Sequence, residues 1–130
     1  MISRYLLPVI IFILSISACA QVDNSKSISN DEFRELLKND TSSIILDVRT
    51  AEELTGPLGK IENVINIPVQ QLQQRINELE PYRDKEIIII CRTQNRSSAA
   101  VDILLRNGYK AKCVLGGMME YNSKIKKSEK

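Results

Sequence analysis

Ile87-Ile88-Ile89-Ile90 is the stretch that decides the fold, and it leads directly into Cys91. Four β-branched residues in a row favour a strand, and an unbroken apolar run is typical of a strand covered on both faces. Strands of this kind occur in parallel sheets, whose connections place helices on both sides. The sequence therefore predicts a central parallel strand that ends at a cysteine.

Helical and strand-like segments alternate on either side of this run. Ser29 and Glu32 have the spacing of a helix capping box, and Leu72, Ile76 and Leu79 recur at i, i+4 and i+7. The alternation predicts an α/β fold with a mainly parallel sheet and helices on both faces. We expect strands at residues 44–48, 64–67 and 113–115, and helices at residues 30–39, 72–80, 97–106 and 118–124.

Composition excludes several classes of function. The 130 residues suit one domain, and 43% hydrophobic with 26% charged residues is in the globular range. A net charge of +2 with only 5% aromatic residues does not indicate a nucleic-acid partner. The chain has no histidine, which excludes Ser-His-Asp and Cys-His catalytic pairs and metal sites that use imidazole.

Residues 1–18 have the layout of a secretory signal, since Arg4 precedes an apolar run from Tyr5 to Leu14, which is shorter than the roughly 20 residues of a spanning helix. Residues 16–19, Ile-Ser-Ala-Cys, resemble the lipobox of bacterial lipoproteins, which implies lipidation of Cys19 and a membrane as partner through the lipid anchor. An ordinary cleaved signal or a marginal membrane anchor is the alternative. We expect a polar tether at 19–27, a domain at 28–123 and a charged tail at 124–130, on the periplasmic or extracytoplasmic face.

A short polar loop, residues 91–96, separates the central strand from the next helix. In open parallel sheets, sites form at the carboxyl ends of strands. Backbone N–H groups of such a loop, together with a helix N-terminus, favour an anion. We expect this anion to be the thiolate of Cys91, because the pKa of a thiol falls beside helix N-termini and arginines. The thiolate is also the nucleophilic form of cysteine. The loop therefore predicts a nucleophile that needs no general base.

At this loop the sequence resembles the single-domain rhodanese-like sulfurtransferases. The resemblance covers residues 28–121, and its most specific part is the six-residue loop followed by Ser97-Ser98. Three further motifs occur in the family's order: Asp47-Val48-Arg49, Asn66-Ile67-Pro68 and Gly116-Gly117. Each motif alone is weak, but their order and spacing together are specific. The resemblance implies the three-layer rhodanese-like fold, with helices on both faces of the sheet.

The resemblance also implies a reaction, in which Cys91 takes a sulfane sulfur from a donor such as thiosulfate and passes it, as a persulfide, to an acceptor. The implied partners are a small sulfur-containing anion and a thiol acceptor or thiol protein, and no cofactor is implied. Asp47 and Arg49 are expected to support the site structurally. The residues expected to hold the donor and the persulfide are those that follow the cysteine in the loop: Arg92, Thr93, Gln94, Asn95 and Arg96.

Gln94 departs from the family, which usually has glycine at this position. A positive φ at Gln94 would cost on the order of 1 kcal/mol, so the loop shape and the activity depend on its conformation. A non-catalytic or redox-sensing module is therefore an alternative function. An arsenate reductase or phosphatase is less favoured, because four residues separate Cys91 from Arg96 where the phosphatases of this fold have five.

Other polar residues have simpler interpretations. Cys113 lies in an apolar segment and is expected in the core, with a disulfide to Cys91 as the alternative. Glu52 and Glu53 are expected on a solvated face, with Glu53 within reach of Arg49.

Overall fold

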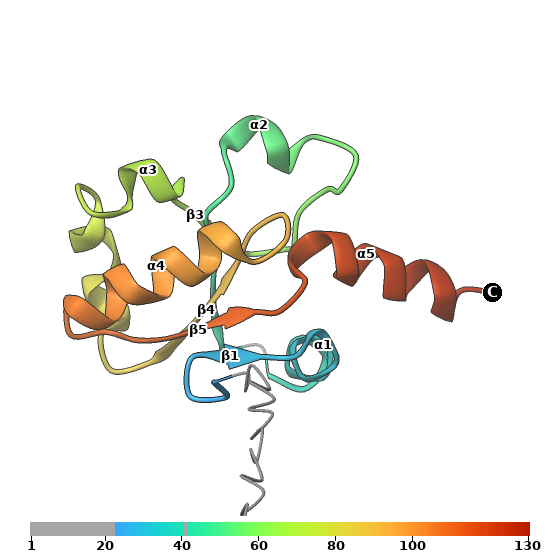
Figure 1. The fold of residues 1–130 in the computed structure, drawn as a ribbon, viewed down its shortest axis with the longest axis horizontal. Coiled ribbons are helices and arrows are strands. Elements are labelled where there is room, and N and C mark those ends of the chain that lie inside the picture. Colours follow the sequence, from blue (N-terminus) through green and yellow to red (C-terminus); the bar gives the residue numbers. More distant parts are fainter. Residues whose placement is uncertain (1–22, 41) are drawn as a thin grey trace, which may run out of the picture.

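The computed structural model describes residues 23–40 and 42–130 and has a five-stranded sheet at its centre (Figure 1). The strand order is β1-β5-β4-β2-β3, and every neighbouring pair is parallel. The predicted α/β fold with a parallel sheet is confirmed. The strands are β1 (Ser27–Ile28), β2 (Ile44–Asp47), β3 (Ile65–Asn66), β4 (Glu86–Ile90) and β5 (Lys110–Val114).

Helices cover both faces of the sheet, and a separate hydrophobic cluster lies on each face. One cluster joins the sheet to α3, η1 and α4, and the other joins it to α1 and α5 (Figure 1). The helices are α1 (Asn30–Asn39), α2 (Ala51–Leu54), α3 (Val69–Leu72), the 3-10 helix η1 (Ile76–Tyr82), α4 (Asn95–Arg106) and α5 (Gly117–Ser128).

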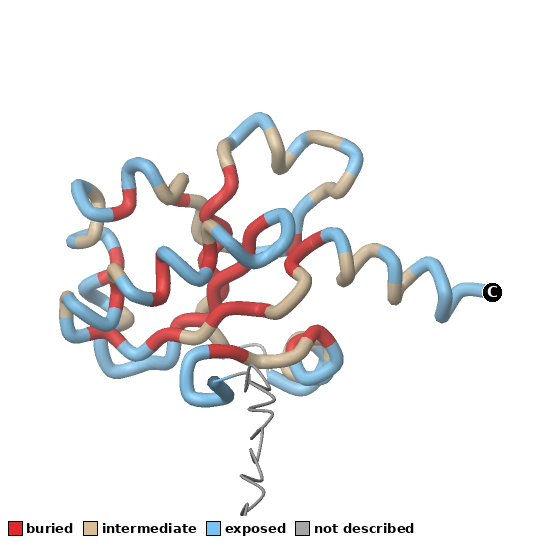
Figure 2. The backbone as a smooth tube through the Cα atoms, viewed as in Figure 1, coloured by how far each residue is buried: buried red, intermediate tan, exposed pale blue. Residues whose placement is uncertain are grey.

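The four isoleucines of β4 form the centre of the core. Successive side chains of a strand point to opposite faces. Ile87 and Ile89 accordingly belong to the α4 cluster, whereas Ile88 and Ile90 belong to the α1 cluster. All four are at most 2% exposed, and the tube in Figure 2 is buried along this strand. The predicted central strand is confirmed, together with its position in front of Cys91.

The predicted helix over residues 72–80 is wrong in its type. Leu72 ends the short helix α3, and Leu79 belongs to η1, which also contains Pro81. Residues 73–75 form a turn that interrupts the predicted helix. Pro81 has no N–H group, and its ring would clash with the carbonyl four residues earlier in an α-helix, which disfavours α-helical geometry in the residues before it. Both leucines are nevertheless buried, so the spacing correctly identified the buried side chains.

The ends of the domain also differ from the prediction. Ser27, expected in the tether, is buried in β1 and pairs with Cys113 of β5. α5 continues to Ser128, through most of the predicted tail, and Lys124 binds Asp31 of α1 at 2.9 Å and Glu120 at 3.0 Å. These ion pairs fix α5 at Lys124, the first residue of the expected charged tail.

The predicted signal segment and Cys19 lie outside the described residues. Within residues 23–40 and 42–130, no helix is both long and apolar enough to cross a membrane.

Replacing Ile89 by alanine should lower the free energy of unfolding by about 2–5 kcal/mol, because it leaves a cavity in the fully buried central strand. Ile65→Ala in β3 is the matched control, since Ile65 is only half-buried and should cost less. Urea denaturation of both variants measures the difference. Equal losses would contradict the central position of β4.

Candidate functional site

The predicted loop consists of four residues and the first turn of a helix. Cys91 follows β4 at the carboxyl end of the sheet, and α4 begins at Asn95. The sequence predicts that this helix begins at Ser97. In the structure, Asn95 and Arg96 already belong to its first turn and not to the loop. The shorter loop places the first N–H groups of α4 close to the cysteine.

The sulfur of Cys91 lies against the N-terminus of α4. The backbone N–H of Ser97 donates to Sγ at 3.4 Å, and the thiol contacts the Ser97 hydroxyl oxygen at 3.4 Å. That hydroxyl donates to the Gln94 carbonyl at 3.1 Å. Cys91 is only 1% exposed and also packs in the α4 cluster. The helix N-terminus therefore provides the positive end of a dipole at the sulfur, as the sequence predicted.

Arg96 is bound by Glu53, although the sequence analysis assigned it to the donor. Its two terminal nitrogens each donate to one carboxylate oxygen at 2.7 Å. The Glu53 carboxylate also accepts the backbone N–H of Thr50 at 3.0 Å, in the capping box of α2. The prediction that Glu53 lies on a solvated face is therefore wrong: α2 turns its side chain toward the start of α4.

Hydrogen bonding to Arg96 lowers the pKa of Glu53 from its ordinary value of 4.5 to about 2. Partial burial opposes this shift, and the Thr50 hydrogen bonds add to it. The same pair raises the pKa of Arg96. The pair is therefore fully charged at neutral pH.

Asp47 and Arg49 form a second ion pair, which is buried below the site. The Arg49 Nη2 atom lies 2.7 Å from the Asp47 carboxylate, and the two side chains are 1% and 0% exposed. Asp47 also accepts the backbone N–H of Arg49 at 3.0 Å, and Arg49 donates to the Gly59 carbonyl at 2.8 Å. This geometry fits the structural role expected for the two residues. The expected contact between the Arg49 and Glu53 side chains is not formed: Arg49 pairs with Asp47, and only the backbone oxygen of Glu53 lies near it, at 3.4 Å.

Arg92, Thr93 and Asn95 are exposed, and of these Arg92 lines a cavity. The cavity has a volume of about 270 Å³ and lies beside the loop. Arg92 makes no ion pair with any residue of the described part of the chain. The cavity is lined by Arg49, Glu53, Gly56, Pro57, Leu58 and Arg92.

Gln94 does not adopt the positive φ that glycine would allow. Its φ is −164°, which is extended backbone open to any residue. Its side-chain carbonyl accepts the backbone N–H of Gly116 at 3.2 Å. Glutamine is thus accommodated without the expected strain, and it links the loop to the turn that follows β5.

This turn, Gly116-Gly117, and the residues that follow it pack against the backbone of the loop. The N–H groups of Met118 and Met119 donate to the carbonyls of Cys91 and Arg92 at 2.9 and 3.0 Å. A Cβ atom on Gly117 would lie 2.6 Å from the Cys91 carbonyl oxygen and would meet that of Thr93 as well. Gly117 also has a φ of +54°, so both the close approach and the conformation require glycine.

Asn30 is a residue of this region that the sequence analysis missed. It is 1% exposed at the start of α1, and its side-chain amide donates to the carbonyls of Leu115 and Gly117 at 3.0 and 3.1 Å. Its Oδ1 atom has no hydrogen-bond partner within the described residues. Local sequence gives no signal for these contacts, because they join positions 85 and 87 residues apart.

Cys113 lies in the core, as predicted. It is 6% exposed and faces the α4 cluster, and burial raises the pKa of its thiol. Both Cys91 and Cys113 are free thiols, so the alternative of a disulfide is not what the structure shows. No group of three His, Cys, Asp or Glu side chains that could hold a metal lies in the described part of the chain.

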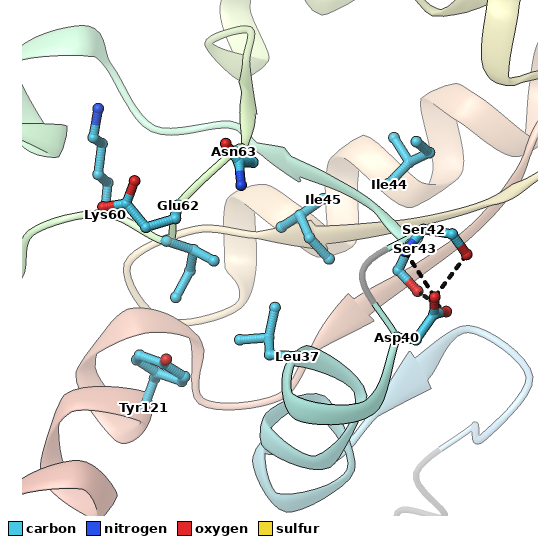
Figure 3. A pocket seen from close by; sticks show the side chains of 11 residues that line it. Leu37, Asp40, Ser42, Ser43, Ile44, Ile45, Lys60, Glu62, Asn63 and Tyr121 are labelled. Atoms are coloured by element: carbon cyan, nitrogen blue, oxygen red, sulfur yellow. Dashed lines mark hydrogen bonds between the residues drawn. The ribbon is translucent and has the colours of Figure 1, made fainter.

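Another cavity lies at a different place in the fold (Figure 3). It has a volume of about 500 Å³ and lies against Ile44, the first residue of β2, with Leu37 of α1 and Tyr121 of α5 at its wall. None of the residues predicted for the site lines it. Tyr121 packs edge-on against Phe33, with ring centroids 5.9 Å apart.

Residues 29–124 match the model of the rhodanese-like domain. The chain belongs to the rhodanese-like family. A rhodanese-related protein from Thermoplasma volcanium has a similar solved structure, with a TM-score of 0.67 and 36% identity over 76% of this chain and 92% of that one. The family and the fold expected from the loop are thereby confirmed.

Curated relatives agree with this assignment. YtwF of Bacillus subtilis, named a candidate sulfurtransferase, is 31% identical over 78% of this chain and 94% of its own length. YrkF of the same organism, named a candidate sulfur carrier protein, is 35% identical over 75% of this chain. The tRNA uridine(34) hydroxylase of Wigglesworthia glossinidia brevipalpis is 37% identical over 79% of it. The chain spans 51% of YrkF and 33% of the hydroxylase.

Replacing Gly117 by alanine should destabilise the domain by several times the cost of Gly59→Ala. Both glycines have a positive φ, +54° and +60°, but a Cβ at Gly59 meets nothing within 4 Å. Gly59→Ala should therefore cost only the conformational strain, about 1 kcal/mol. Thermal unfolding of the two variants measures the difference, and similar costs would show that the turn does not press on the loop.

Glu53→Gln should make the domain less sensitive to acid. A lowered pKa means that the ion pair with Arg96 stabilises the fold above pH 4.5 and that this contribution is lost as the pH falls toward 2. Since both side chains are 30% exposed, the contribution is on the order of 1 kcal/mol. Urea midpoints between pH 7 and pH 2 measure it. If the urea midpoints of the variant and the wild type fall equally as the pH is lowered, the Glu53–Arg96 pair does not contribute to this pH dependence.

Proposed function

We propose that the protein is a sulfurtransferase that carries sulfane sulfur on Cys91. The observation that supports this most directly is the position of the sulfur at the carboxyl end of β4, within 3.4 Å of the Ser97 N–H at the start of α4. A helix N-terminus stabilises an anion, and both the thiolate and its persulfide are anions. The names of YtwF and YrkF as candidate sulfurtransferase and sulfur carrier support the same chemistry.

The reaction has two steps. The Cys91 thiolate attacks the outer sulfur of the donor, a new S–S bond forms, and the bond between that sulfur and the rest of the donor breaks with its electron pair on the leaving anion. A thiolate or another thiophile then attacks the outer sulfur of the persulfide, and Cys91 leaves as a thiolate. The N–H group of Ser97 at the α4 terminus lies beside the sulfur in both steps, and the proposal uses no general base.

Arg92 is the loop cation that we assign to the anionic donor. Arg96 is held by Glu53, whereas Arg92 is exposed and lines the cavity beside the loop. An unpaired guanidinium attracts an approaching anion more strongly than one already bound to a carboxylate. Of the other residues expected to hold the donor, Thr93 and Gln94 belong to the loop and Asn95 begins α4; the Gln94 side chain is bound to the backbone of Gly116.

A second candidate function is a binding or redox-sensing module without turnover. The observation in its favour is the 1% exposure of Cys91, since a sulfur transfer needs direct access to Sγ. In the sulfurtransferase, the exposed loop residues Arg92 and Thr93 have to move enough to admit the donor. The two candidates differ in whether a sulfane donor modifies Cys91.

Incubation of the purified protein with a sulfane donor should add the mass of one sulfur atom, and Cys91→Ala should abolish both this gain and thiocyanate formation with cyanide. Cys113→Ala is the matched control, because Cys113 is a buried free thiol outside the loop. Intact-mass spectrometry and peptide mapping make the measurement. Absence of the gain with every sulfane donor would support the module without turnover.

Export and lipidation at Cys19 stay predictions from the sequence, because residues 1–22 lie outside the described structure. Under this proposal the domain transfers sulfur at the periplasmic or extracytoplasmic surface of a bacterial membrane, to a thiol or a thiol protein.

A further inference from the structure

Asn30 is a buried polar residue that the proposed mechanism does not use. It is 1% exposed at the first position of α1, although asparagine is mostly found on protein surfaces. Its Nδ2 atom donates to the Leu115 carbonyl at 3.0 Å and to the Gly117 carbonyl at 3.1 Å. Because the amide nitrogen has two hydrogens, these contacts use its whole donor capacity.

The carbonyl half of the same amide is unpaired. Oδ1 is buried and has no hydrogen-bond partner among residues 23–40 and 42–130. A buried acceptor without a partner lowers stability, so stability alone does not explain an asparagine here. Asn30 does not cap α1 either, since Ser29 and Glu32 form the capping box of this helix. What the amide provides is the pair of bonds from Nδ2.

These two bonds hold the Gly116-Gly117 turn from both sides. Leu115 precedes the turn, and Gly117 is its second residue, so one side-chain amide spans it. The N–H of Leu115 also donates to the Ile28 carbonyl at 3.0 Å. The segment that ends β1 and begins α1 therefore fixes the backbone on one side of the turn.

The other side of the turn binds the loop through the same peptide group. The Gly117 carbonyl and the Met118 N–H belong to one planar trans peptide group and point in opposite directions. Asn30 binds the carbonyl, and the N–H donates to the Cys91 carbonyl at 2.9 Å. A bond that fixes one end of a planar group fixes the direction of the other end. One rigid unit thus joins the Asn30 side chain to the backbone of Cys91.

We propose that Asn30 is a positioning residue for Cys91 and acts through the Gly117–Met118 peptide group. This inference rests on the proposed sulfurtransferase function. Without the Nδ2 bonds the peptide group can rotate, and the Cys91 backbone loses the partner that keeps its sulfur 3.4 Å from the Ser97 N–H. Asn30 does not line the cavity beside the loop, so it acts on the transfer step and not on donor binding.

The test measures single-turnover loading of Cys91 by intact mass over a range of donor concentrations, with thiosulfate or benzenethiosulfonate, whichever loads the wild type faster. Asn30→Ala should lower the maximal rate constant about tenfold or more, because small misplacements of a reacting atom slow a reaction strongly. The donor concentration at half-maximal rate should stay within about twofold, because the donor site is intact. The rate constant does not depend on how much of a variant is folded.

Ser29→Ala is the matched control. It removes the cap of the same helix, and the hydrogen bonds of Ser29 in the described structure all lie within the start of α1. Both kinetic values should therefore stay at those of the wild type. Asn30→Ser keeps one donor and should lie between the wild type and Asn30→Ala, and it takes the place of the alanine variant if that variant does not fold.

Amide hydrogen exchange tests the same link without sulfur chemistry. In Asn30→Ala the amides of Met118 and Met119 should exchange about tenfold faster, the factor expected for one weakened hydrogen bond, and in Ser29→Ala they should not. The amides of β4 report global unfolding and serve as the internal reference.

A wild-type rate constant in Asn30→Ala, an equal loss in Ser29→Ala, or unchanged exchange at Met118 and Met119 would overturn the positioning role and leave the sulfur transfer intact. If the wild type takes up no sulfur, the proposed function fails. The exchange measurement then still decides whether Asn30 holds the backbone of Cys91.

Discussion

The close contact between the Gly116-Gly117 turn and the loop after β4 is the constraint on which the site depends. The two N–H groups that follow the turn bind the carbonyls of Cys91 and Arg92, so these carbonyls point toward α5. The next N–H groups, at the start of α4, are left to face the sulfur, and that of Ser97 reaches it. A side chain at Gly117 would occupy the space of these carbonyl oxygens. The orientation of the loop is therefore set by its contact with α5 as well as by its own sequence.

Ion pairs then determine which charges of the site are available to a ligand. Asp47 and Glu53 bind two of the three arginines that surround the loop; Asp47 is the last residue of β2, and Glu53 lies in α2, the next helix of the chain. Buried or half-buried pairs of this kind fix side-chain positions more than they add stability. Of the three arginines, Arg92 therefore has the one guanidinium that is both exposed and without an ion pair among the described residues.

Much of the fold was predictable because it depends on local patterns. The isoleucine run identified the central strand, the Ser29–Glu32 capping box identified the start of α1, and the loop motif identified the family. The partners within the site were not predictable in the same way. Glu53 and Arg96 are 43 residues apart, and nothing in their neighbourhoods distinguishes a paired glutamate from a solvated one. The backbone conformation of Gln94 could not be predicted from its residue type either, because its side chain contacts Gly116, which is 22 residues away.

Asn30 connects the beginning of the domain with its end, and this has a consequence for when the site forms. Its partners are the carbonyls of Leu115 and Gly117, and β1 beside it pairs with β5, the last strand. A chain still emerging from the ribosome carries Cys91 before Leu115 and Gly117 have been made, so these contacts cannot yet form. Because the loop needs the Gly116-Gly117 turn and α5 for its support, Cys91 reaches its final surroundings only after these residues have been made and have packed against the loop.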